Sequence, residues 1–106
     1  MPKISNSASS ISYVRMKPQI YLTQYGLMAE RHWREFRPAM VRDMEIKGTL
    51  TEALFEAQEQ TIDEMELLTR KLETEIDLTP QQAETTAWEM IREKYILLPA
   101  EESQSL

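Results

Sequence analysis

The stretch that most constrains this chain runs from Leu50 to Asp77, where apolar residues recur at spacings of three and four. This spacing is typical of one stripe along an α-helix. The stripe consists of Leu50, Leu54, Ala57, Thr61, Met65, Leu68, Leu72 and Ile76. The sequence therefore predicts a single helix, roughly 40 Å long at about 1.5 Å per residue, with Leu54, Met65, Leu68 and Leu72 in the core. Since one helix cannot bury its own stripe, flanking segments or a second copy of the chain must cover it.

Capping signals precede both the long helix and the segment that follows it. Thr49 with Glu52 has the spacing of a capping box, in which a hydroxyl and a carboxylate satisfy free backbone N–H groups. Thr79 with Gln82 has the same spacing, and Pro80 occupies the first helical position. The second box predicts a third helix that ends near Leu98, before Pro99. Its apolar face consists of Ala83, Ala87, Met90, Ile91, Lys94 and Leu98.

A first helix is predicted from Thr23 or Gln24 to Lys47, and Gly48 ends it. One face carries Tyr25, Ala29, Trp33, Phe36, Met40 and Met44, so the phase of the pattern continues across Pro38. The segment is therefore one helix kinked at Arg37–Pro38 or two short helices with the same inward side, and we favour the kink.

The chain of 106 residues, 42% of them hydrophobic, is long enough for one domain. Residues 1–12 are rich in serine and predict a disordered arm. Residues 13–98 form a single helical domain, and residues 99–106 a flexible acidic tail. The predicted fold is an all-α, three-helix bundle with a kinked first helix, a long central helix and a disordered N-terminal arm.

Several classes of chemistry are excluded by the residues that the sequence lacks. It has no cysteine, no Glu-x-x-His motif and no glycine-rich phosphate loop, and His32 is its one histidine. We therefore expect no enzyme, no catalytic residue, no cofactor and no metal. No apolar run approaches the roughly 20 residues that span a bilayer, which predicts a soluble, cytoplasmic protein without a membrane partner.

Charge is distributed unevenly along the chain. Residues 1–48 carry eight Lys or Arg against four Asp or Glu, a net charge of +4, whereas residues 49–106 carry four against fourteen, a net charge of −10. Two candidate binding surfaces follow from helical spacing. The basic patch of the first helix consists of Arg31, Arg34 and Arg42, and the acidic face of the long helix consists of Glu52, Glu56, Glu59, Asp63 and Glu66.

Three functions are compatible with these surfaces. The acidic face favours a non-catalytic interaction protein that binds a basic protein or a nucleoprotein. Regularly spaced carboxylates can also imitate a phosphate backbone, which indicates a DNA-mimic inhibitor of a basic nucleic-acid-binding enzyme. The basic patch instead favours a DNA-contacting accessory protein, although its aromatic neighbours point to the core. The Leu and Met stripes would also suit a homodimer.

One segment resembles a known family. The motif Tyr25-Gly26-x-Met28, then Arg31, Arg37-Pro38, the turn from Ile46 to Leu50 and the long helix are similar to the small transposon-encoded proteins called TnpV. The resemblance covers Tyr21 to Leu68. It implies residence on a mobile element or in a phage, without a defined catalytic activity.

Overall fold

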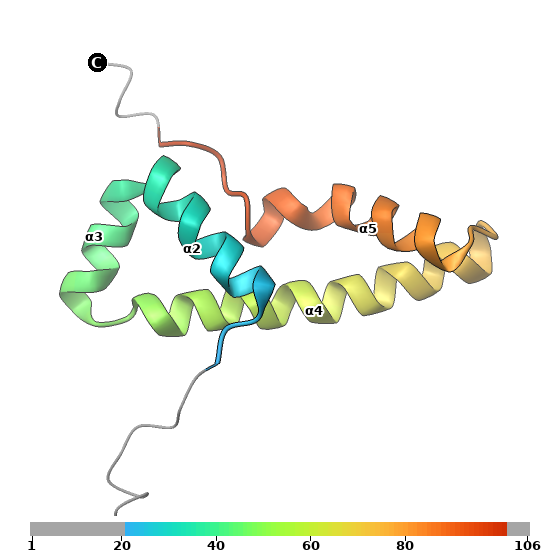
Figure 1. The fold of residues 1–106 in the computed structure, drawn as a ribbon, viewed down its shortest axis with the longest axis horizontal. Helices are drawn as coiled ribbons and strands as arrows, with labels where there is room; N and C mark the ends of the chain where they lie inside the picture. The colour runs from blue at the N-terminus through green and yellow to red at the C-terminus, as the bar shows by residue number, and fades with distance from the viewer. Residues whose placement is uncertain (1–20, 102–106) are drawn as a thin grey trace, which may run out of the picture.

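The structure, a computed structural model, describes residues 21–101 of the chain (Figure 1). These residues form α2 (Gln24–Phe36), α3 (Pro38–Lys47), α4 (Leu50–Glu75) and α5 (Pro80–Tyr95), with no strand among them. The all-α prediction is confirmed for this part of the chain. The three-helix count is not, because the described residues contain four helices. The predicted disordered arm, residues 1–12, lies outside the described residues.

The helix ends at Phe36 and a new helix begins at Pro38, so the favoured prediction of one kinked helix is wrong. Arg37 has φ −132° and ψ 52°, which is not helical. The α region is sterically disfavoured for a residue before proline, and Pro38 starts a new helix at the first position. The alternative of two short helices is therefore the correct one, and the two run in different directions in Figure 1.

A tight turn of two residues joins α3 to α4. Gly48 adopts the left-handed conformation at φ 73°, and the N–H of Thr49 donates to the carbonyl of Met44 at 2.8 Å. Thr49 has ψ 5°, whereas an N-cap side chain needs extended backbone, and its hydroxyl makes no capping bond. The predicted capping box of Thr49 and Glu52 is therefore wrong, although α4 begins at Leu50 as predicted.

The two long helices, α4 and α5, form an antiparallel hairpin. The left-handed Asp77, at φ 63°, follows the end of α4 at Glu75, two residues earlier than predicted. The second capping box is confirmed, because the N–H of Gln82 donates to the Thr79 hydroxyl and the Gln82 side chain accepts from the Thr79 N–H. α5 ends at Tyr95, before the predicted Leu98.

The core has two parts. The first lies where α2 and α3 meet the N-terminal half of α4, and its buried members are Ala29, Trp33, Val41, Leu54, Ala57 and Ile96. The second lies between α5 and the C-terminal half of α4, and its buried members are Met65, Leu72, Ala83, Ala87 and Ile91. Tyr25 and Trp88 pack against both parts, with their rings stacked at 5.5 Å.

Core membership is confirmed for Leu54, Met65 and Leu72, whereas Leu68 is only half-buried. Several predicted inward residues are exposed: Phe36, Lys94, Ile76 and Met90. Phe36 is the last residue of α2, and Ile76 lies one residue beyond the end of α4. The exposure of Phe36 and Ile76 therefore follows from helix boundaries that differ from the predicted ones.

A C-terminal strap, residues 96–101, crosses the break between α2 and α3. Three side chains of these elements donate to strap carbonyls: Trp33 Nε1 to Ile96 O at 3.0 Å, His32 Nε2 to Leu98 O at 2.7 Å, and Arg37 Nη1 to Pro99 O at 3.1 Å.

The far end of the strap caps α3. The Glu101 carboxylate accepts from the N–H groups of Ala39 at 3.2 Å and Met40 at 2.9 Å, while the Glu101 N–H donates to Phe36 O at 2.9 Å. These contacts provide the cap that Arg37 does not. Of the predicted flexible tail, Pro99 and Glu101 are thus hydrogen-bonded, and residues 102–106 lie outside the described residues.

Candidate functional site

The acidic face follows the outer side of α4, opposite the core. Its members recur at alternating spacings of four and three, and all are exposed: Glu52, Glu56, Glu59, Asp63 and Glu66. The first four line one shallow groove of about 390 Å³ together with Phe55 and Gln60. Glu66 instead lines a separate groove that reaches Glu84 of α5. The structure therefore brings together four of the five predicted acidic residues.

The carboxylates of the acidic face are not neutralised within residues 21–101. None of them forms an ion pair there, and the one contact is a 3.4 Å hydrogen bond that Gln58 Nε2 donates to Glu59 Oε2. Because adjacent turns of a helix lie about 5.4 Å apart, successive negative charges remain close. This row of charges therefore produces a negative field along the N-terminal half of α4.

The basic patch differs from the acidic face, because one of its members, Arg34, forms ion pairs with acidic residues. The Arg34 guanidinium pairs with Glu30 in the same helix and with Glu45 of α3, both at 3.1 Å. The hydrogen bonds that Arg34 donates to Glu45 and Glu30 raise the pKa of Arg34, so this cation is held as a link between α2 and α3. Arg31 and Arg42 are exposed and form no ion pair with the described residues.

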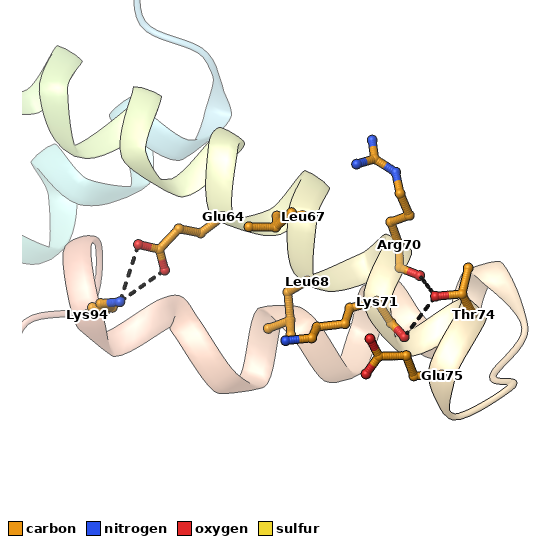
Figure 2. Close-up of a pocket in the computed structure, with 8 residues that line it drawn as sticks. All are labelled: Glu64, Leu67, Leu68, Arg70, Lys71, Thr74, Glu75 and Lys94. Carbon is orange, nitrogen blue, oxygen red and sulfur yellow. Dashed lines mark hydrogen bonds and ion pairs between the residues drawn. The ribbon is translucent and has the colours of Figure 1, made fainter.

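A third groove, not predicted from the sequence, runs between α4 and α5 (Figure 2). Its volume is about 590 Å³, and its lining consists of Glu64, Leu67, Leu68, Arg70, Lys71, Thr74, Glu75 and Lys94. Leu67 is 64% exposed. Arg70, Lys71 and Glu75 form no ion pair within the described part of the chain.

One end of this groove is closed by a polar cluster of three residues. Glu64 pairs with Lys94 at 3.1 Å and accepts a hydrogen bond from the Tyr95 hydroxyl. The hydrogen bond from Tyr95, and after it the one from Lys94, lowers the pKa of Glu64. In turn, the hydrogen bond that each of Lys94 and Tyr95 donates to Glu64 raises its own pKa. The cluster therefore links α4 to α5 and leaves Glu64 charged at neutral pH.

Residues 21–101 contain no group of three or more His, Asp or Glu side chains placed to hold a metal ion. His32 donates to the Leu98 carbonyl and stacks near Phe36, with the ring centroids 4.6 Å apart. It is thus part of the packing between α2 and the strap. None of the four helices is long and apolar enough to cross a membrane.

Fold and surfaces together define a small all-α protein with two differently charged sides. No family model, curated protein or solved structure matches the chain. The similarity to TnpV proteins therefore stays a prediction.

The third groove has a signal in the sequence, but this signal is not an apolar stripe. Gln60, Asp63, Glu64, Leu67, Arg70, Lys71 and Thr74 recur at threes and fours and share one side of α4. This side contains a single apolar residue, so its periodicity lies in charge rather than in hydropathy. Its distinguishing feature is the change from acidic to basic residues at Leu67.

Proposed function

We propose that this chain is a small, non-catalytic interaction protein that binds a basic protein surface through the acidic face of α4. The observation that carries the proposal is the contrast between its two charged surfaces. The carboxylates of α4 are exposed and without ion pairs in residues 21–101, whereas Arg34, in the basic patch, is already paired twice.

Electrostatic complementarity supports a partner of positive charge. A row of like charges accelerates association with an oppositely charged surface and discourages partners of the same sign. Nucleic acid has the same sign as the acidic face, and within the basic patch only Arg31 and Arg42 form no ion pair with residues 21–101. This makes the DNA-contacting accessory protein the weaker hypothesis.

The chemistry of the acidic face also fits inhibition by mimicry. If the basic partner normally binds a nucleic acid, the carboxylates of α4 would occupy the site of the phosphates. A setting on a mobile element or in a phage, which the similarity to TnpV proteins implies, would suit such a role. Competition between this chain and DNA for the purified partner distinguishes an inhibitor from an adaptor.

The test is capture of the partner from the native host, followed by measurement of its affinity for matched variants. We expect the triple variant Glu56→Gln, Glu59→Gln, Asp63→Asn to lose at least about tenfold in affinity, because three unpaired carboxylates would no longer face the basic surface. Added salt should weaken the wild-type complex in the same direction.

A second triple variant controls for total charge. Glu84→Gln, Glu89→Gln, Glu93→Gln removes three negative charges from exposed positions of α5 and should bind as the wild type does. Equal loss in both triple variants would show that only net charge matters. Loss of binding in Arg31→Glu, Arg42→Glu alone would replace the proposal with the basic-patch hypothesis.

A further inference from the structure

We infer that the groove between α4 and α5 is a self-association surface, on which a second copy of this chain docks its own α4 in antiparallel orientation about Leu67. The inference concerns the part of α4 around Leu67, C-terminal to most of the acidic face, and uses no other partner. It does not rest on the proposed function, although Asp63 belongs to both surfaces.

The apolar centre of this surface is Leu67. It is 64% exposed, and the half-buried Leu68 lies beside it in the same groove. Figure 2 shows the groove along the hairpin, with Glu64 and Lys94 at one end and Thr74 and Glu75 towards the other. The core of α2 and α3 lies on the N-terminal half of α4, so this part of the hairpin has α5 as its packing neighbour.

The charges around Leu67 show that the occupant is a second copy. Asp63 and Glu64 precede Leu67 by four and three residues, and Arg70 and Lys71 follow it by three and four. All four lie within about 60° of Leu67 around the helix axis. The pattern is therefore antisymmetric, with acids before the leucine and bases after it.

An antiparallel pair of helices makes this pattern self-complementary. With a two-fold axis at Leu67, each residue lies opposite the residue equally far on the other side of Leu67 in the partner copy. Asp63 then faces Lys71 of the second copy, Glu64 approaches Arg70, and Leu67 meets its own equivalent. A parallel arrangement would instead place like charges against each other, which is unfavourable.

Lys71 and Arg70 are available for this pairing. Neither forms an ion pair within residues 21–101, and Asp63 is likewise unpaired there. Glu64 is held by Lys94 and Tyr95, so Asp63 with Lys71 is the pair that association would newly form. Because of the two-fold symmetry, this ion pair would form twice in the dimer.

The experiment measures molar mass by light scattering and sedimentation, from low to high micromolar concentration, with the purified chain. We expect the mass to rise from 12.5 kDa towards twice that value. The single reversals Lys71→Glu and Asp63→Lys should each weaken association by about tenfold or more, since each places like charges opposite each other twice. The double variant Asp63→Lys, Lys71→Glu should restore association, because it exchanges the signs and keeps the net charge of −6.

The apolar centre is tested by Leu67→Gln, with Ile46→Gln as its control. Ile46 is more exposed, at 78%, and belongs to α3. α3 lies at the N-terminal end of α4, away from its C-terminal half (Figure 1). We expect Leu67→Gln to remain at 12.5 kDa and Ile46→Gln to associate as the wild type does. A wild-type chain that stays at 12.5 kDa at every concentration overturns the inference, and so does a double variant that fails to recover.

Discussion

Gln58 shows at the scale of one residue how the fold depends on a polar contact within the core. Its side chain is only 1% exposed. Its amide nitrogen donates to Tyr21 O, and its oxygen accepts from the Thr23 N–H and hydroxyl, which fixes the start of α2 on α4. A Cβ atom on Gly26 would lie 2.6 Å from that same oxygen, so the glycine allows this close approach.

The first prediction concerns Gln58→Ala. The change would remove the acceptor of the Thr23 N–H in a partly buried site, at a cost of about 1–3 kcal/mol in the free energy of unfolding. Urea denaturation at low protein concentration measures it. The control Gln60→Ala, exposed on the same helix, should stay within about 0.5 kcal/mol of the wild type. Equal effects would show that Gln58 does not hold α2.

The sequence predicts core residues correctly where helical period determines their position. It does not predict burial that depends on contacts with residues distant in the sequence. Leu54, Met65 and Leu72 were predicted from helical period alone, because period determines which side chains share a face. Gln58 could not be predicted, because its burial depends on backbone groups 35 and 37 residues away. Leu68 was predicted as core and is half-buried, since only α5 lies beside that part of α4.

At the scale of elements, the α4–α5 hairpin depends on the cluster of Glu64, Lys94 and Tyr95. Both bonds to Glu64 favour its charged form and lower its pKa in the folded state. A lowered pKa contributes stability above the ordinary glutamate value of 4.5, and this contribution disappears as the pH falls through the folded-state value. The hairpin should therefore loosen on the acid side.

The second prediction follows from that sign. Glu64→Gln should reduce the free energy of unfolding at neutral pH, and the difference from the wild type should vanish as the pH falls below the ordinary glutamate range. Urea titrations at a series of pH values measure it. Glu66→Gln, at an exposed position without an ion pair in residues 21–101, should follow the wild-type curve. A difference that stays constant with pH would contradict the assignment.

Element boundaries were predicted well where local chemistry sets them. Pro80 and the Thr79 box start α5, and Gly48 ends α3, because backbone preference acts within a few residues. The break at Arg37 was an open alternative, since apolar phase continues across Pro38 whether the helix bends or restarts. What the sequence did not reveal is the strap, whose bonds to α2 and α3 join residues 61 to 66 positions apart.

At the scale of the whole molecule, two core parts meet at one pair of aromatic rings. Tyr25 and Trp88 pack against both parts, and burial raises the pKa of the Tyr25 hydroxyl. The α2–α3 end and the far end of the hairpin are therefore coupled through these rings, through α4 itself and through the strap that continues α5. The prediction of a single helical domain requires this coupling, whose strength cannot be predicted from helical periodicity.

The third prediction tests that coupling. Trp88→Ala should destabilise the protein by less than the roughly 3–5 kcal/mol of a fully buried tryptophan, because Trp88 is half-buried. It should also separate the two ends, so that amide hydrogen exchange near Val41 and near Ile91 no longer reports one common opening energy. Met90→Ala, at a position 62% exposed, is the control and should leave exchange cooperative. Uniform exchange in Trp88→Ala would show that α4 and the strap couple the ends without the aromatic pair.

The strap also sets the order in which the molecule assembles. The hairpin of α4 and α5 closes across a turn of a few residues, whereas the strap must find α2 and α3 across more than 60 positions. Loop closure over a longer chain costs more entropy, and contacts distant in sequence form late in folding. We therefore expect the hairpin to form first and the strap to dock last. On this order, substitutions in the hairpin should change the folding rate, and those in the strap should change the rate of unfolding.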